Sequence, residues 1–152
     1  MRELPEHLRI RQMEDGDLDQ VTALEEKIFS IPWTRDGFYE SLHSQYTLYL
    51  VAETEKIVGY CGYMRSFEDA DICNVAVDPE MRCRGIGEAM LRRLMEEGRK
   101  DGIERYTLEV RVSNVSALRL YQKLGFEIVG KRKNFYALPT EDAYIMWTGE
   151  VE

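Results

Sequence analysis

Alternation of apolar and polar residues predicts a strand near the start of the chain, followed by two helices. Residues 8–13 alternate as a half-buried strand does. After Asp15, a candidate N-cap, apolar residues recur at helical spacing to about Ser30. The Pro-containing segment 30–33 interrupts this pattern, and Thr34 is a candidate cap for a second, short helix. We therefore expect one strand and two helices before the main sheet.

Three strand-like segments follow, separated by polar turns. They cover residues 47–52, 57–67 and 71–77, and their close spacing predicts a meander of three antiparallel strands. The third segment is apolar at nearly every position, which is typical of a strand with both faces covered. We expect this strand to be central.

The second half of the chain alternates between helix and strand. Helical spacing returns from Ile86 to Gly102, and residues 106–111 then read as a strand. A strand, a helix and a second strand of these lengths imply a parallel pair joined by a right-handed crossover. Asn114 is a candidate cap for a last helix, which ends at Gly125.

Two final segments, 126–133 and 143–148, read as an antiparallel pair around a loop that contains Pro139. The predicted fold class is therefore α/β. It has a mixed, mostly antiparallel sheet of about seven strands, a central parallel pair and about four helices on both faces. No repeat or linker divides the chain, so residues 1–152 are expected to form a single domain.

Composition narrows the class of protein. No apolar run approaches the roughly 20 residues that would cross a bilayer, and the first residues lack the apolar core of an export signal. We expect a cytoplasmic protein without a membrane partner. The net charge of −8 disfavours nucleic acid and favours a cationic partner. Three cysteines without C-x-x-C spacing predict neither a disulfide framework nor a zinc site, so no metal is expected.

The segment Arg82-Cys83-Arg84-Gly85-Ile86-Gly87 contains the clearest chemical signal. It follows the apolar strand and Pro79, and it leads directly into an amphipathic helix. Unpaired backbone N–H groups and the helix dipole meet at such a point, so an anion is the expected ligand. The glycines permit close approach of a phosphate, and the arginines add positive charge. The alternative is that the two glycines only shape a strand-to-helix turn.

Neither a P-loop nor a dinucleotide-binding pattern is present. The pattern R-x-x-G-x-G after a proline-ended strand resembles the acyl-coenzyme A loop of the GNAT acetyltransferase superfamily, and the order of predicted elements is similar over nearly the whole chain. The resemblance implies acetyl-CoA as co-substrate, with its pantetheine arm between two splayed strands. The cofactor contacts that it implies are Asn74, Val75, Ala76, Val77, Arg82, Cys83, Arg84, Gly85, Ile86, Gly87, Glu88 and Asn114.

Residues 108–114 and 117–126 resemble the N-terminal acetyltransferases of this superfamily. The similarity is greatest to the RimI type, which acetylates the N-terminal alanine of a small-subunit ribosomal protein. The resemblance implies that Glu109 is the base, directly or through a water, and that Tyr121 is the acid. Pro32, Trp33 and Tyr136 lie in segments that resemble the substrate-side turn and hairpin of this type.

The implied partner is a protein N-terminus, expected to be that of a basic ribosomal protein. An α-amine titrates near pH 8 and a lysine near 10.4, so the uncharged lysine costs roughly 3 kcal/mol more at pH 7. This difference favours N-terminal acceptors. Lysines, small amines, antibiotics and a broad set of N-termini remain open as alternatives, as does a non-catalytic acyl-CoA-binding module. Glu109 and Tyr121 argue against the module, because a sensor needs no proton-transfer groups. We expect a monomer or a weak homodimer.

Each catalytic residue also has a purely structural interpretation. For Glu109 the alternative is an ion pair with Arg111 or a cap for a backbone group, and Tyr121 has the spacing of a core aromatic. Tyr136 has the alternative of an exposed aromatic without a role. A route through an acetylated cysteine is disfavoured, because Cys73 lies in an apolar strand, where the pKa of a thiol rises.

Overall fold

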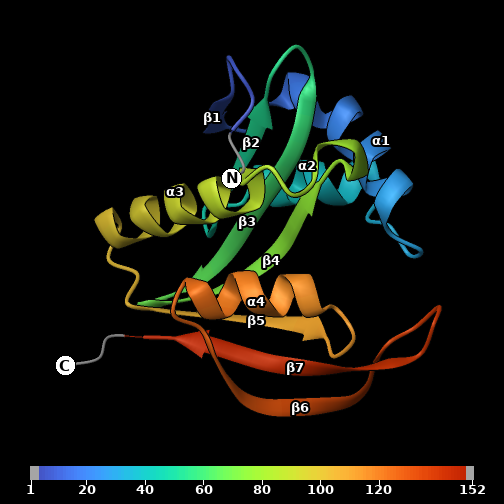
Figure 1. The fold of residues 1–152 in the computed structure, drawn as a ribbon. Coiled ribbons are helices and arrows are strands. Elements are labelled where there is room, and N and C mark those ends of the chain that lie inside the picture. The colour runs from blue at the N-terminus through green and yellow to red at the C-terminus, as the bar shows by residue number, and fades with distance from the viewer. Residues whose placement is uncertain (1–3, 150–152) are drawn as a thin grey trace.

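The computed structural model describes residues 4–149, which form a seven-stranded mixed sheet with helices on both faces (Figure 1). The first and last three residues of the expected domain 1–152 lie outside this range. The elements are β1 (Arg9–Gln12), α1 (Leu18–Ile28), α2 (Arg35–Leu42), β2 (Thr47–Glu53), β3 (Ile57–Ser66), β4 (Asp69–Val77), α3 (Ile86–Lys100), β5 (Arg105–Arg111), α4 (Val115–Lys123), β6 (Glu127–Tyr136) and β7 (Glu141–Thr148). The strand order is β1-β2-β3-β4-β5-β7-β6, and β4 and β5 are the parallel pair. The predicted fold class is confirmed.

Two apolar cores lie on opposite faces of the sheet. Helices α3 and α4 cover one face, and α1 and α2 lie behind the other (Figure 1). Met90, Leu91 and Leu94 of α3 are fully buried in the first core, and Val21 of α1 is buried in the second. The spacing of these apolar residues in the sequence follows one side of each helix, which explains why the helices form and dock there.

Strands β4 and β5 separate after a short stretch of pairing. Their register contains three residue pairs, which end at Asp71 and Thr107. Beyond this point β4 runs on to Val77 and β5 to Arg111, and the two strands point away from each other on the right of Figure 1. The register of β3 with β4 also shifts near Cys73, and such a bulge bends a strand. The splayed strands implied by the resemblance are confirmed.

Three local expectations are corrected. Asp15 does not cap α1: it begins a short 3₁₀ helix that ends at Asp17, and α1 starts at Leu18. Strand β6 continues to Tyr136, three residues beyond the predicted end. The third strand of the meander is central, but its two faces are not both covered along its length, because Cys73 is exposed where β4 leaves β5.

The start of α1 is held by Asp17, whose carboxylate accepts hydrogen bonds at 2.8 and 2.9 Å from Arg11 of β1. These bonds lower the pKa of Asp17 below its usual value. The charged form is therefore stabilised in the folded protein, and this stabilisation is present above the ordinary aspartate pKa near 3.9 and is lost as pH falls through the lower folded value.

We expect Asp17→Asn to lower the free energy of unfolding at pH 7 by about 2 kcal/mol, since the charge-assisted bonds are weakened. The difference between variant and wild type should shrink below pH 4. Urea unfolding at both pH values measures it. A difference that stays constant with pH would contradict the assignment. Asp36→Asn is a suitable control, because Asp36 is an exposed carboxylate in the first turn of α2.

Candidate active site

The segment before α3 presents main-chain donors. Cys83 and Gly85 have φ values of 65° and 83°, and Gly85 is the N-cap of α3. The first amide of this region with a backbone acceptor is that of Ala89, which bonds to the Gly85 carbonyl at 3.0 Å. Within residues 4–149, the amides of residues 82–88 have no hydrogen-bond acceptor. Several N–H groups at a helix N-terminus with free bonding capacity fit a diphosphate.

Several side chains in and next to this loop already make contacts within the protein. Ile86 is buried in the core, and Glu88 pairs with Arg92 and with Lys123 of α4, each at 2.9 Å. These cations lower the pKa of Glu88, Lys123 being the stronger cause. The Nε of Arg82 donates to the Val77 carbonyl at 3.2 Å, so Arg82 braces the loop against the end of β4. Ile86 and Glu88 can therefore serve an anion through their amides, not their side chains.

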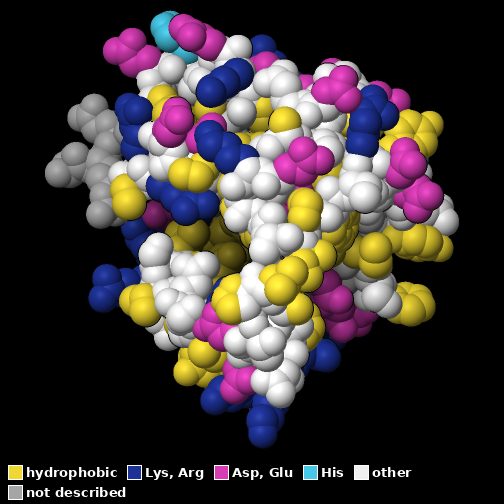
Figure 2. Space-filling model, turned by 90° about the vertical axis from the view of Figure 1, so that its right-hand side faces the viewer, with side chains coloured by type: hydrophobic (Ala, Val, Ile, Leu, Met, Phe, Trp, Pro, Cys, Tyr) yellow, Lys and Arg dark blue, Asp and Glu magenta, His cyan; other side chains and the backbone are white. Residues whose placement is uncertain are grey.

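The opening between β4 and β5 reaches the surface beside this loop. Seen from the side on which the two strands diverge, the molecule is hollowed at mid-height, hydrophobic side chains line the hollow, and Lys and Arg side chains lie along its upper edge (Figure 2). On β4, Val75 and Val77 are half-buried. The side chain of Asn74 is 7 % exposed and accepts a hydrogen bond from the Tyr49 hydroxyl at 3.0 Å. Asn74 therefore offers this opening its main chain.

Glu109 projects from β5 on the face opposite α3 and α4. Its neighbours Leu108 and Val110 are buried in the core beneath these helices, and side chains alternate along a strand. Glu109 lies 3.5 Å from the Nε of Arg132 on β6. The ion pair with Arg111 considered from the sequence is wrong, because Arg111 reaches Glu141 at 3.1 Å. The Glu109 carboxylate is therefore accessible and has one exposed cation beside it.

Tyr136 lies near Glu109, and Tyr121 lies near Tyr136. Burial raises the pKa of Tyr121, and the nearby Tyr136 adds to this effect. Burial also raises the pKa of Tyr136, and the charge of Glu109 acts in the same direction. The Tyr121 hydroxyl has no hydrogen-bond partner within residues 4–149. Tyr121 is thus protonated at neutral pH and free to donate, which suits a general acid.

Tyr136 is not a free loop aromatic. It ends β6 and is half-buried, and the Arg111 guanidinium lies 4.4 Å from its ring centroid. Asn114 caps α4 as expected, since its side chain accepts from the Ala117 amide at 3.2 Å. Its contact with the cofactor remains a prediction.

Two of the three cysteines, Cys61 and Cys73, are poorly suited to nucleophilic catalysis. Cys61 is buried, and desolvation raises its pKa well above the usual value. For Cys73, desolvation of the thiol is the main cause of a raised pKa, and the carboxylates of Asp71 and Glu109 add to it. A thiol with a raised pKa holds little thiolate at neutral pH. Within residues 4–149 no cluster of His, Cys, Asp or Glu has an arrangement for binding a metal ion, and no helix is long and apolar enough to span a membrane.

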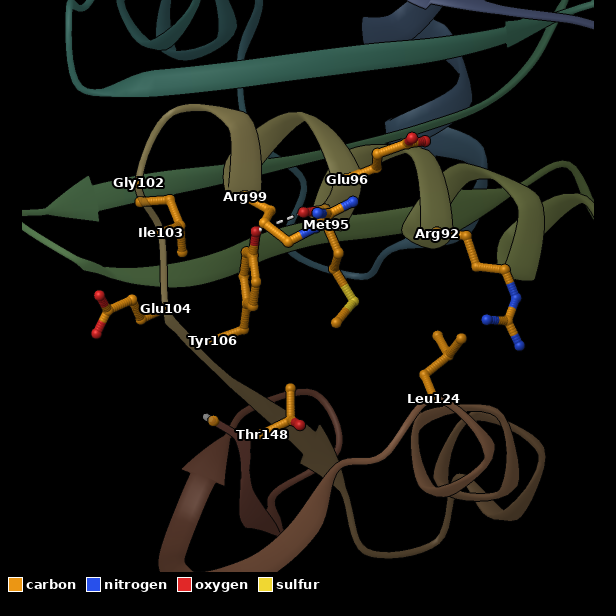
Figure 3. Close-up of a pocket in the computed structure, with 11 residues that line it drawn as sticks. Arg92, Met95, Glu96, Arg99, Gly102, Ile103, Glu104, Tyr106, Leu124 and Thr148 are labelled. Carbon is orange, nitrogen blue, oxygen red and sulfur yellow. Dashed lines mark hydrogen bonds between the residues drawn. The ribbon is translucent and has the colours of Figure 1, made fainter. Parts of the chain in front are cut away.

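A second depression lies away from these residues. It is a cavity of about 660 Å³ between the C-terminal half of α3, the start of β5 and the end of β7 (Figure 3). Its rim includes Arg92 and Arg99, and Tyr106 crosses its wall to donate to the Met95 carbonyl at 2.9 Å. None of the residues predicted for the site lines it. We assign the site to the β4–β5 opening, because the free amides and the proton-transfer groups lie there.

Pro32 and Trp33 lie between α1 and α2, on the face of the sheet opposite α3. Sequence reasoning missed the residue that holds them. Glu25 of α1 is a buried carboxylate, and it accepts a hydrogen bond from the Trp33 amide at 3.0 Å. Glu25 lies at helical spacing from Leu18 and Val21, on the apolar side of the helix. A charged residue at such a position indicates a buried carboxylate with hydrogen-bond donors nearby, and the sequence therefore contained a sign of it.

A splayed parallel pair, free amides at a helix N-terminus and an accessible glutamate define the fold and site of an acyltransferase. The pattern of the Acetyltransferase (GNAT) family matches residues 18–126, and the chain belongs to this family. It is therefore an acetyl-CoA-dependent acetyltransferase.

Individual proteins with similar sequences and structures belong to the same group of acetyltransferases. A Bacillus subtilis (strain 168) protein, to which ribosomal protein bS18-alanine N-acetyltransferase activity is provisionally ascribed, is 43% identical over 91% of this chain and 93% of its own. The Escherichia coli (strain K12) bS18-alanine N-acetyltransferase is 33% identical over 90% of this chain and 94% of its own. The crystal structure of the Escherichia coli ribosomal-protein-S18-alanine N-acetyltransferase superposes with a TM-score of 0.87 at 30% identity and covers 93% of each chain.

The left-handed backbone at Gly85 gives a test of the loop. Gly85→Ala places a Cβ at a φ of 83°, which costs about 1 to 2 kcal/mol unless the loop moves. We expect KM for acetyl-CoA to rise about tenfold, because a loss of about 1.4 kcal/mol in binding free energy corresponds to a factor of ten in affinity. Steady-state kinetics measures it. Gly102→Ala is the matched control: Gly102 has a φ of 89° with open space around it, beyond the other end of α3. An equal rise in both variants would contradict a role for the loop.

Proposed function

We propose that this protein transfers the acetyl group of acetyl-CoA to the N-terminal alanine of a small-subunit ribosomal protein, the homologue of bS18. The observation that supports the proposal is the β4–β5 opening, with free amides of residues 82–88 beside it and Glu109 close by. Both relatives described above are named for this acceptor. The net charge of −8 favours a basic peptide. The proposal includes a single domain over residues 1–152, a cytoplasmic location and a monomer or weak homodimer.

The amides of residues 82–88 would hold the diphosphate of acetyl-CoA, and the unpaired edge of β4 from Asn74 to Val77 would hold its extended arm. The bound acetyl-CoA supplies a thioester carbonyl that an uncharged amine attacks. Arg82 and Arg84 add positive charge at the loop. Asn114 caps α4 at the end of β5, and in the proposal its amide group also contacts the arm.

Glu109 would accept the proton of the N-terminal ammonium, directly or through a water, and Tyr121 would donate a proton to the departing sulfur. The nitrogen loses two protons in all: the first would pass from the ammonium to the Glu109 carboxylate before attack, and the second would leave the nitrogen of the tetrahedral intermediate as the C–S bond breaks. The second proton would restore the Tyr121 phenol, which has protonated the departing thiolate, and Glu109 would release its proton to solvent, so that the products are the amide, the free thiol and one proton. Pro32, Trp33 and Tyr136 would contact the acceptor peptide from the two sides of the opening. The α-amine suits one accessible carboxylate, because it loses its proton more easily than lysine does.

Mass spectrometry of peptides after incubation with acetyl-CoA tests the proposal. One peptide begins with alanine followed by basic residues, a second has the same sequence with its α-amine blocked and one lysine left free, and spermidine represents small amines. We expect acetylation of the first peptide only. Acetylation of the blocked peptide or of spermidine, with none of the free N-terminus, would overturn the proposed acceptor.

A further inference from the structure

A carboxylate on the apolar side of α1 is the most unusual buried group outside the residues discussed for catalysis. Glu25 is 3 % exposed, and it follows Leu18 and Val21 along the side of α1 that packs on the sheet. Burial of a carboxylate without partners costs several kcal/mol, so such a group persists where donors meet it.

Two donors from separate segments meet this carboxylate. The Trp33 amide donates to Oε2 at 3.0 Å, and the Tyr60 hydroxyl of β3 donates to Oε1. The first donor belongs to the turn between α1 and α2, and the second to the middle of the sheet. Glu25 therefore ties the main chain of the turn to β3 through hydrogen bonds to a charged acceptor, which are stronger than neutral ones.

The rings of Trp33 and Tyr60 are also connected, because both pack on Phe38 of α2. The Trp33 ring packs on Phe38 of α2 with centroids 5.2 Å apart, and Phe38 meets the Tyr60 ring edge-on at 5.7 Å. We call Glu25, Trp33, Phe38 and Tyr60 the Glu25 anchor. Tyr60 pairs with Ala76 of β4, so the anchor connects the turn to the strand beside the opening.

The same helix also contacts the residue that follows β4. Lys27 of α1 lies 3.0 Å from the carboxylate of Asp78, which is itself buried and accepts from the Glu80 amide at 3.1 Å. Helix α1 is thus fixed to β3 through Glu25 and to the end of β4 through Lys27. Because α1 is fixed at both points, the turn that follows α1 has a fixed position relative to the loop of residues 82–87.

We propose that Glu25 is a positioning residue, which sets the place of the Pro32–Trp33 turn against which the acceptor peptide binds. This inference rests on the proposed function, because it takes the acceptor to be a peptide bound beside this turn. Without the carboxylate, the Trp33 amide loses its buried acceptor and the turn is free to shift. A displacement of about 1 Å at a binding surface is enough to reduce turnover by up to about 100-fold.

Steady-state kinetics with the alanine peptide and acetyl-CoA tests this role through the separate KM values. We expect Glu25→Ala to raise KM for the peptide about tenfold and to leave KM for acetyl-CoA within about twofold, a loss near 1.4 kcal/mol in peptide binding. Glu25→Gln should restore the peptide KM to within about threefold, since its amide can accept from Trp33 and donate to the Tyr60 oxygen.

Two further variants separate positioning from folding. Tyr60→Phe keeps the ring and removes one donor, and it should raise the peptide KM about threefold even if Glu25→Ala does not fold. Leu24→Ala, at a buried apolar neighbour on α1, should lower the melting temperature without a change in peptide KM.

The outcomes are distinct. Peptide KM values in Glu25→Ala and Tyr60→Phe that equal the wild-type value, or that rise no more than in Leu24→Ala, would overturn the inference alone. Failure of the wild type to acetylate any peptide N-terminus would overturn the proposed function, and the inference with it.

Discussion

Glu109→Gln is expected to reduce kcat about 10²- to 10⁴-fold, the usual contribution of a general base. Glutamine has nearly the same shape as glutamate and cannot take the proton of the acceptor ammonium. KM for acetyl-CoA should change little, because Glu109 lies on the face opposite α3 and the loop before it. Stopped assays at several pH values with saturating peptide measure the effect.

The pH profile separates a base from a merely structural carboxylate. The residual activity of Glu109→Gln should rise with pH as the α-amine loses its proton unaided near pH 8. Glu127→Gln is the charge-matched control, since Glu127 is an exposed carboxylate at the start of β6. Unchanged kcat in Glu109→Gln near neutral pH would remove Glu109 from the base role.

Tyr121→Phe is expected to reduce kcat about 100-fold, because the departing thiolate then lacks its proton donor. The melting temperature should hardly change, since the Tyr121 hydroxyl bonds to no group within residues 4–149 and the ring contact with Phe126 is kept. Differential scanning calorimetry and steady-state kinetics on the same preparation measure the two properties.

Tyr106→Phe is the reciprocal control. Its hydroxyl is bonded to the Met95 carbonyl at 2.9 Å and lies in the wall of the cavity away from the opening. Its loss should lower the free energy of unfolding by about 1 kcal/mol and leave kcat unchanged. If Tyr121→Phe destabilises the fold and keeps full activity, the hydroxyl is structural and the acid is another group.

Tyr121 and Tyr136, the two tyrosines proposed for the site, differ in how well the sequence predicted their surroundings. Tyr121 has the spacing of a core residue, and the structure does bury it, at 7 % exposure. Tyr121 lies near Tyr136, which in turn lies near Glu109, and these three residues belong to α4, β6 and β5, which are separate in the chain. The spacing identified the environment of Tyr121, and the resemblance to a family suggested its role.

The contacts of Glu25 and Glu109 could be predicted only in part, because their partners are distant in the sequence. The helical position of Glu25 shows that its carboxylate must be buried, but its donors come from Trp33 and Tyr60, which are 8 and 35 residues away. For Glu109, the nearest cation in the sequence is Arg111, yet the ion pair forms with Arg132. Strand β6 is next to β7 and β7 is next to β5, so the Arg132 side chain reaches Glu109 across β7.

The sequence by itself determined the order of helices and strands, the parallel pair and the glycine-containing turn that leads into α3. These features depend on local periodicity and on proline and glycine. Only the tertiary structure decided where β4 and β5 part, which cation lies beside Glu109, and that Glu25 accepts a hydrogen bond from the Trp33 amide. Those properties arise from contacts between segments distant in the chain, and packing of the whole sheet sets them.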